Sequence, residues 1–197
     1  MDWEAYFAEL EGQFADDVAA EQAAIDVENE RVRQAHLDMV SRLRALAADR
    51  AALTIHTTGK HQISGTVRVV GADWCAVEVD TGLIRCIRIE AIHSVLLSSD
   101  AVRRSLMTVP PDALTGRATF GYVLRGLARH RTVVLAQFAD SAVATGTIDR
   151  AGRDHCELAV HDAHTSRRDG DVTRIMMVPF TALDAVSPLS GGSALLG

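Results

Sequence analysis

The residues best suited to chemistry lie close together between positions 154 and 164. Asp154, His155 and Cys156 are consecutive, and His161 and His164 follow a few positions later. Cysteine and histidine at such spacing can bind zinc, and a thiol beside an imidazole can act as a nucleophile. An internal repeat, described below, argues against both uses, because the matching cysteine of the first copy has no comparable histidines. We therefore expect Cys156 to be a small core residue, with His161 and His164 opening an exposed loop, and we predict no metal site.

Other signs of catalysis are missing from the sequence. His56, His61 and His93 fall near the ends of predicted strands, where histidines are usually solvated, and no acidic partner is implied for them. The phosphate-loop, dinucleotide-binding, G-x-S-x-G and H-E-x-x-H patterns are absent. We predict a protein that is not an enzyme, without a cofactor and with no small-molecule substrate identified.

Arginine is the main source of positive charge, and it suggests a nucleic-acid hypothesis. Pairs of arginines can grip phosphate groups. The candidates lie on or just after the second-copy helix and in an insertion: Arg125, Arg129, Arg131, Arg167 and Arg168. A further pair, Arg103 and Arg104, lies in the connection between the copies. A solvated surface of mixed charge explains the same residues equally simply.

The aromatic residues near the N-terminus form a second candidate site. Trp3, Tyr6, Phe7, Leu10 and Phe14 fall on one side of a predicted helix. This stripe could dock on the body of its own chain, or it could bind a protein partner or a second copy.

The charge of the chain is divided unevenly. Residues 1–30 hold ten acidic residues and no lysine or arginine, which leaves 16 acids against 20 bases in the rest. The N-terminal segment could therefore fold against its own body or bind a basic partner. No apolar run reaches the roughly 20 residues that span a bilayer, and the acidic start does not resemble a signal peptide. The three cysteines, an odd number at wide spacing, indicate a reduced, cytoplasmic protein.

The elements that carry these residues begin with helix. Residues 2–50 contain no proline and one glycine, and they are rich in helix formers. Apolar residues recur every seven positions, but a strict coiled-coil seam fails in the middle. We predict one long helix, or two in series with a break at Gly12 or near Asn29. The seven-residue series is Val18, Ile25, Val32, Met39 and Leu46.

From Ala52 the apolar pattern changes to the alternation that is typical of strands. The first group of predicted strands is Leu53–Thr57, Ile63–Val70, Cys75–Val79, Ile84–Ile89 and Ser94–Leu97. A polar connection follows, and a helix around Tyr122–Arg129 precedes the second group. That group comprises Thr132–Phe138, Ala144–Arg150, Cys156–Val160 and Thr173–Val178.

The two groups of strands resemble each other in sequence. At a spacing of 81 residues, positions 65–79 align with positions 146–160 without a gap, and six of them are identical. The identical pairs are Gly65/Gly146, Thr66/Thr147, Gly71/Gly152, Asp73/Asp154, Cys75/Cys156 and Val79/Val160. The preceding helices match at the same spacing, and after a ten-residue insertion positions 91–95 match positions 182–186. We predict an internal duplication.

A helix followed by a bent strand with a central glycine, a G-x-D turn and a closing strand resembles an Sm-like or SH3-like small barrel. The whole chain is similar to tandem-barrel proteins of actinobacteria. The resemblance implies an α+β fold with a long N-terminal helix and two duplicated small antiparallel β-barrels, each preceded by a helix. It also implies RNA binding, which Sm-like proteins carry out. The predicted domains are an acidic helical segment (1–42), a first barrel (43–98), a connection (99–116), a second barrel (117–187) and a disordered tail (188–197).

Two functional hypotheses follow from these patterns. The first is a non-enzymatic cytosolic scaffold or adaptor whose acidic helix binds a protein partner or a second copy. The alternative is an RNA- or DNA-binding regulator in which the acidic helix competes for the basic surface.

Overall fold

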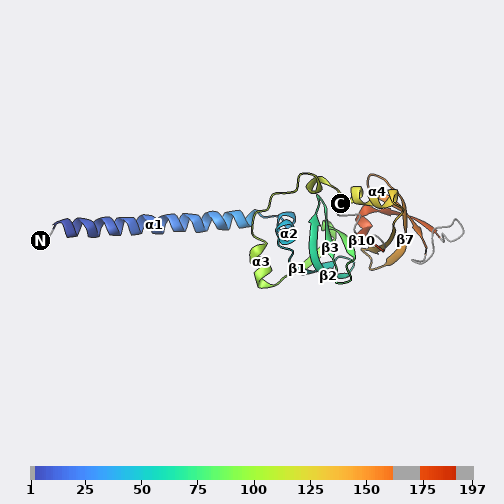
Figure 1. The fold of residues 1–197 in the computed structure, drawn as a ribbon, viewed down its shortest axis with the longest axis horizontal. Helices are drawn as coiled ribbons and strands as arrows, with labels where there is room; N and C mark the ends of the chain where they lie inside the picture. The colour runs from blue at the N-terminus through green and yellow to red at the C-terminus, as the bar shows by residue number, and fades with distance from the viewer. Residues whose placement is uncertain (1–2, 162–173, 190–197) are drawn as a thin grey trace. The chain divides into compact units, whose positions relative to one another are not determined.

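The computed structural model of the protein describes residues 3–161 and 174–189. The chain divides into two compact units, Met1–Asp38 and Met39–Gly197 (Figure 1). The first unit consists of helix α1. The second, which we call the body, contains every strand.

Helix α1 spans Trp3–Ala35 and is continuous. The predicted break at Gly12 or near Asn29 is wrong. A glycine inside a helix costs only about 1 kcal/mol, and the good helix formers on both sides of Gly12 sustain the helix through it. Near its end, the Glu30 carboxylate accepts hydrogen bonds from Arg33 and Gln34. These side-chain bonds lower the pKa of Glu30 to about 2. The interruption comes instead at residues 36–38, just before helix α2, Met39–Ala48.

The strands of the first half of the body confirm the sequence prediction to within a residue or two. They are β1 Ala52–Thr57, β2 Gln62–Val70, β3 Trp74–Glu78, β4 Ile84–Arg88 and β5 Ile92–Leu96, with a 3-10 turn, η1 Ile89–Ala91, before the last. The alternation of buried and exposed residues in β1 is the pattern that identified it.

The connection and the second half contain two elements that the sequence prediction missed. One is the short helix α3, Ser99–Arg104, which begins where the Ser98 hydroxyl accepts a hydrogen bond from Ala101 N. The other is the last strand, β10. The second half comprises α4 Phe120–Arg129, β6 Val133–Phe138, β7 Val143–Ala151, β8 His155–Val160, β9 Arg174–Pro179 and β10 Leu183–Pro188; 3-10 turns lie at η2 Thr115–Arg117 and η3 Phe180–Ala182.

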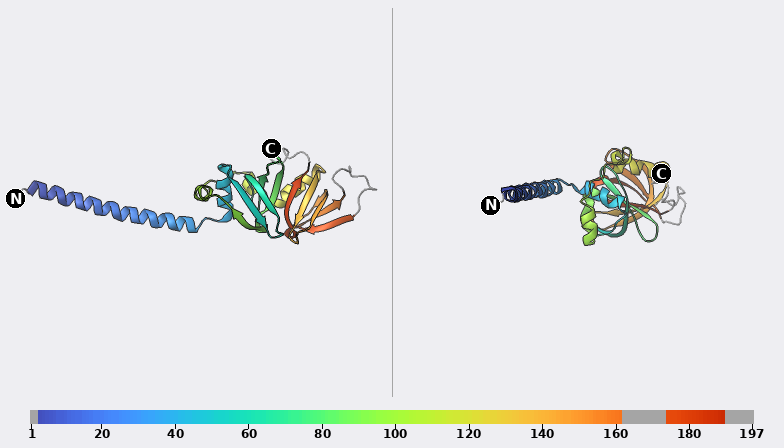
Figure 2. Two further views of the ribbon diagram at one scale, coloured as in Figure 1. Left: turned by 90° about the horizontal axis from the view of Figure 1, so that it is seen from below. Right: turned by 60° about the vertical axis from the view of Figure 1, so that its left-hand side comes forward.

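All the strands belong to one antiparallel sheet of ten strands, and the fold is α+β. The order across the sheet is β5-β1-β2-β3-β4-β10-β6-β7-β8-β9, and the sheet does not close on itself. The two halves are therefore joined by one pair, β4 with β10, in which Ala185 lies opposite Ile87 and Val186 opposite Cys86. The strands of the two halves lie side by side in Figure 2.

Backbone features recur in the two halves at the spacing of 81 residues. Lys60 and Ser141 both adopt a positive φ, at 62° and 72°. Gly65 and Gly146 both lie so close to the neighbouring strand that a Cβ would stand 2.1 Å from Glu78 O and 2.2 Å from Ala159 O, respectively. Glycine is therefore required at both positions for the strands to pack at this distance.

The body has two hydrophobic clusters, which cross the boundary between the halves. One surrounds α2 and includes Cys75, Val77 and Ile87. The other surrounds α4 and includes Trp74, Ala76, Ile84 and Cys86 of the first half together with second-half residues. Successive residues of β3 and β4 thus face different cores, so the first half contributes one face of these strands to the core of the second half.

Candidate functional site

The aromatic residues of the first candidate site lie on α1, as predicted. Trp3, Phe7 and Phe14 have exposed fractions of 60%, 58% and 72%, and the rings of Trp3 and Phe7 contact each other with centroids 6.2 Å apart. Tyr6 and Leu10 belong to the same helix, but their side chains lie outside the described part of the chain. The next members of the seven-residue series, Val18, Ile25 and Val32, are also exposed.

The arginines of the second candidate site do not all gather on one surface. Arg125, Arg129 and Arg131 are exposed on α4 or just after it, and Arg125 Nη1 donates to Gly152 O over 3.0 Å. Arg167 and Arg168 lie outside the described residues.

The other arginine pair, in the connection, is engaged by acids. Arg103 pairs with Asp100 on α3, and Arg104 Nε lies 2.5 Å from Asp49 just after α2. These arginines attach α3 to the first half, which leaves the α4 group as the exposed positive charge in question.

The histidine and cysteine residues form no reactive centre. Cys156 is buried, which confirms its predicted place in the core. Burial raises the pKa of Cys156 to about 11 and that of Cys75 and Cys86 to about 12, so all three thiols stay protonated and unreactive near neutral pH. Among the described residues, no group of three or more His, Cys, Asp or Glu is placed to hold a metal ion.

The prediction of an exposed His161 is wrong. Its side chain is buried, and its Nε2 lies 2.8 Å from the Thr147 hydroxyl. The last residue pair before the insertion still belongs to the packed end of β8, so this imidazole turns inward. His164 lies outside the described residues. His155 is half-exposed, with Nδ1 2.8 Å from Asp154 Oδ1.

The remaining histidines lie apart along the first half. His56 Nδ1 contacts the Ser94 hydroxyl across the β1–β5 pair at 3.2 Å. His61 Nε2 contacts Phe138 O at 3.0 Å. His93 is exposed on β5. Each thus has its own strand-end position, and the structure does not bring the three together.

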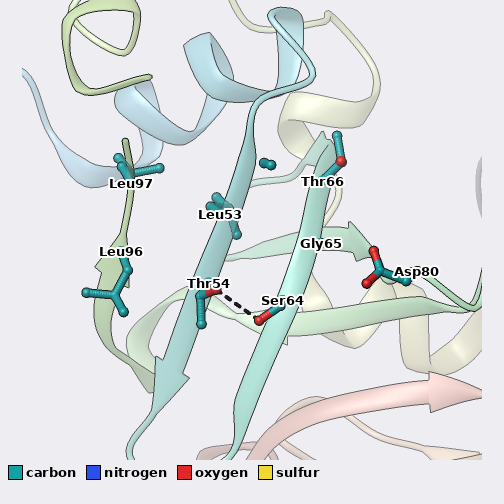
Figure 3. Close-up of a pocket in the computed structure, with 9 residues that line it drawn as sticks. Leu53, Thr54, Ser64, Gly65, Thr66, Asp80, Leu96 and Leu97 are labelled. Atoms are coloured by element: carbon teal, nitrogen blue, oxygen red, sulfur yellow. Dashed lines mark hydrogen bonds between the residues drawn. The ribbon is translucent and has the colours of Figure 1, made fainter. Parts of the chain in front are cut away.

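An open pocket of about 400 Å³ lies at the β5 end of the sheet (Figure 3). Its rim carries the Thr54 and Ser64 hydroxyls, 2.9 Å apart, and the Asp80 carboxylate. At the spacing of 81 residues, Asp80 corresponds to His161, whose larger side chain fills the equivalent place against Thr147. The described lining contains neither a nucleophile–base pair nor an imidazole, and so offers polar contacts without catalytic groups. The lining is Ala52, Leu53, Thr54, Ser64, Gly65, Thr66, Asp80, Leu96 and Leu97.

The most elaborate polar cluster was missed by sequence reasoning, and it joins the two halves. Asp184, on β10, is completely buried. Its carboxylate accepts hydrogen bonds from the Thr58 hydroxyl at 2.9 Å and from Gly59 N at 2.7 Å, in the turn between β1 and β2. A Cβ at Gly59 would stand 2.1 Å from Phe138 O. Only glycine allows this turn to approach the second half so closely.

Two arginines of β4 complete this junction. Arg85 Nη1 donates to Gln137 Oε1 and to the Ser187 hydroxyl, at 3.1 and 3.2 Å, and burial lowers the pKa of its guanidinium. Arg88 donates to the carbonyl oxygens of Leu183 and Thr181, both at 3.1 Å. The junction therefore satisfies its polar groups across the β4–β10 pair.

The connection is also fastened to the first half. Trp74 Nε1 donates to Ala118 O over 2.9 Å, and Asp73 Oδ1 accepts from Phe120 N over 2.6 Å at the start of α4. The predicted capping role of Asp73 is confirmed, although the backbone it caps belongs to the next half. These contacts fix α4 relative to the first half.

Comparison with protein-family models, with curated proteins and with solved structures finds no match for this chain. Within the described ranges, no helix combines the length and the apolar character needed to cross a membrane.

Proposed function

We propose that this protein is a non-enzymatic cytosolic scaffold or adaptor in which α1 binds a protein partner or a second copy of the chain. The observation that carries the proposal is the exposed apolar surface of α1, which includes Trp3, Phe7 and Phe14. A helix of 33 residues is about 50 Å long and gains most of its stability from packing its apolar face. Exposed aromatic groups on such a helix are typical anchors of a binding surface.

The charge of α1 bears on the kind of partner. Residues 1–30 carry ten acids and no lysine or arginine, so two copies of this segment repel each other when they lie side by side. A partner with an apolar groove bordered by basic residues complements both properties of the helix. We therefore favour such a partner over self-pairing of α1, and self-pairing should appear only at high salt.

The body is proposed to be a pair of duplicated Sm-like or SH3-like modules that hold α1. Its support is the common order of elements in the two halves, with a helix, four strands, a 3-10 turn and a closing strand in each. The recurrence of close-packed glycines at Gly65 and Gly146 supports it further. In this account the body contributes rigidity, because the β4–β10 pair and the buried Asp184 join the modules.

RNA or DNA binding is the alternative function, and exposed Arg129 and Arg131 are the observation in its favour. It has less support, since Arg125 is engaged by Gly152 O and the sequence outside residues 1–30 has only four more bases than acids. Non-specific nucleic-acid binding depends on many phosphate contacts.

Co-purification of the full-length chain from its native host tests the proposal, with the eluate examined by mass spectrometry and for nucleic acid. The test variant is Phe7→Ser with Phe14→Ser, and the matched control is Val143→Ser, which changes an exposed apolar residue of β7. A protein recovered with the wild type and the control, lost with the α1 variant and rebound after separate purification, would support the role of α1. Equal recovery with all three would contradict it.

A further inference from the structure

The ten-stranded sheet ends in two edges that differ from each other. Strand β5 pairs with β1 on one side only, and β9 pairs with β8 on one side only. Within the described residues, no strand covers the outer side of either. Unpaired edges of this kind present backbone N–H and C=O groups that can pair with another strand.

The internal junction shows which strand fits on β9. Opposite matched partners, the register gives β9 the place in the second half that β4 has in the first: Cys86 lies opposite Ala76, and Met177 lies opposite Glu157. By the same comparison β5 corresponds to β10. Strand β4 already pairs with β10 inside the chain. The equivalent pair at the free ends is therefore β9 of one chain with β5 of a second chain.

The side chains at the free edges suit burial against each other. Met177 is 71% exposed, whereas its counterpart Cys86 is completely buried in the junction. Leu96 of β5 is 56% exposed, and its counterpart Ser187 bonds to Arg85 inside the chain. Arg85 itself corresponds to Met176. The polar pair of Arg85 with Ser187 is thus replaced at the free ends by an apolar pair, Met176 with Leu96.

The turn next to the junction changes in a complementary way. Inside the chain, Asp184 of β10 binds the backbone of Gly59. At the free ends the counterparts are His93 of β5 for Asp184 and Asp140 for Gly59, and both are exposed. The Cβ of Asp140 prevents the close backbone approach that Gly59 allows, but its carboxylate offers the imidazole of His93 a hydrogen-bonding partner.

We propose that the chain binds a second copy of itself head to tail, with β5 of one copy adding to the outer side of β9 of the next. In this arrangement Val95 lies opposite Met177, as Val186 lies opposite Cys86 inside the chain. The contact is heterologous, so it continues from copy to copy as an open or a closed series. It uses surfaces other than α1 and does not depend on the function proposed for that helix.

Two edge variants of the full-length chain test this contact. Met177→Lys places a charge on β9, and Leu96→Lys places one on β5; a lysine on an edge opposes strand addition. Val143→Lys is the matched control, since Val143 is exposed at 59% on an inner strand. Sedimentation velocity over a range of concentrations should show association of the wild type and the control. Each edge variant alone should associate at least about tenfold more weakly.

Mixing the two edge variants gives the decisive result. The Leu96→Lys chain keeps an intact β9, and the Met177→Lys chain keeps an intact β5, so the mixture should form a one-to-one dimer and stop there. A Val95→Cys chain mixed with a Met177→Cys chain should form a disulfide under mild oxidation, whereas Val95→Cys with Val143→Cys should not. The native cysteines are buried and do not compete.

Three results would overturn the contact: a wild-type chain that stays monomeric, edge variants that associate as well as the wild type, or a mixture that gives no dimer and no cross-link. The Phe7→Ser with Phe14→Ser chain separates this outcome from the role of α1. If it abolishes association and the edge variants do not, copies meet through α1 and the edge contact is wrong. If only the edge variants abolish association, the edge contact stands and says nothing against a separate partner for α1.

Discussion

Replacement of Asp184 by alanine should destabilise the body more than any other single change at the junction. The buried carboxylate accepts two hydrogen bonds, from the Thr58 hydroxyl and from Gly59 N. A hydrogen bond to a charged group contributes about 1.5–3 kcal/mol, and a buried donor left without a partner costs about 1–3 kcal/mol. Loss of the buried charge returns part of this energy, because the folded chain no longer has to desolvate a carboxylate. We expect a net loss of about 2–4 kcal/mol in the free energy of unfolding.

Two further variants divide this effect between its partners. Asp184→Asn keeps an acceptor for Gly59 N and can donate its amide to the Thr58 hydroxyl, so it should cost only about 1 kcal/mol. Thr58→Ala removes the weaker of the two contacts and should also cost about 1 kcal/mol. Because Thr58 and Asp184 are in direct contact, their double variant should deviate from additivity by more than about 0.5 kcal/mol.

Equilibrium unfolding in urea, followed by the fluorescence of the buried Trp74, measures these differences. Asp140→Ala is the matched control, because Asp140 is an exposed acid in the equivalent turn of the second half, and its stability should stay within about 0.5 kcal/mol of the wild type. A loss below about 0.5 kcal/mol for Asp184→Ala would refute the inference that this carboxylate holds the halves together. Two separate transitions, with only one shifted, would refute the inference that the halves unfold as one unit.

Three other predictions concern glycines, thiols and nucleic acid. Gly65→Ala and Gly146→Ala should each lower stability by about 2 kcal/mol or more, because their Cβ atoms overlap a backbone carbonyl, whereas Gly126→Ala, which has nothing within 4 Å of its Cβ, should be neutral or stabilising in a urea titration. The buried cysteines have raised pKa values in the folded chain, so the unfolded chain loses those protons first; stability should be constant below pH 9.0, the ordinary pKa of a thiol, and fall as the pH rises toward about 12, by up to about 1.4 kcal/mol per thiol at pH 10. A pH-independent free energy of unfolding between pH 8 and about pH 10 would contradict this. If the body binds RNA or DNA, deletion of residues 1–30 should strengthen a salt-dependent gel shift, and absence of binding by both chains at low salt would end that alternative.

The strands were predictable because their residues alternate between a core and the opposite surface. Even β3, which is buried on both sides, was found from its β-branched and apolar residues between two turns. The last strand, β10, was missed although it matches β5 in sequence. Its six residues are all buried, including Asp184, and a buried aspartate interrupts the pattern that marks a strand. Its place depends on the Thr58–Gly59 turn, more than a hundred positions away in the sequence.

The errors at Gly12 and His161 have the opposite origin. Local rules gave a break at the glycine and an exposed loop at the histidine, and the surroundings overruled both. Helix formers carry α1 through Gly12, and Thr147 offers His161 a hydrogen bond inside the body. The aromatic stripe of α1 was predictable as a helical face, since its spacing alone defines it. What the stripe contacts is not encoded in that spacing.

The exposure of Trp3 is the most direct test of the central claim that α1 binds another chain. In a full-length Trp74→Phe variant, Trp3 is the one remaining tryptophan, because the chain has two. We predict that its emission and its quenching by acrylamide are those of an exposed indole at low protein concentration, and that addition of the protein partner shields it and shifts its emission to the blue. Self-pairing would instead shield it as the concentration or the salt rises. Shielding of Trp3 in the isolated monomer, unchanged by dilution, would mean that α1 docks on its own body and would contradict the account.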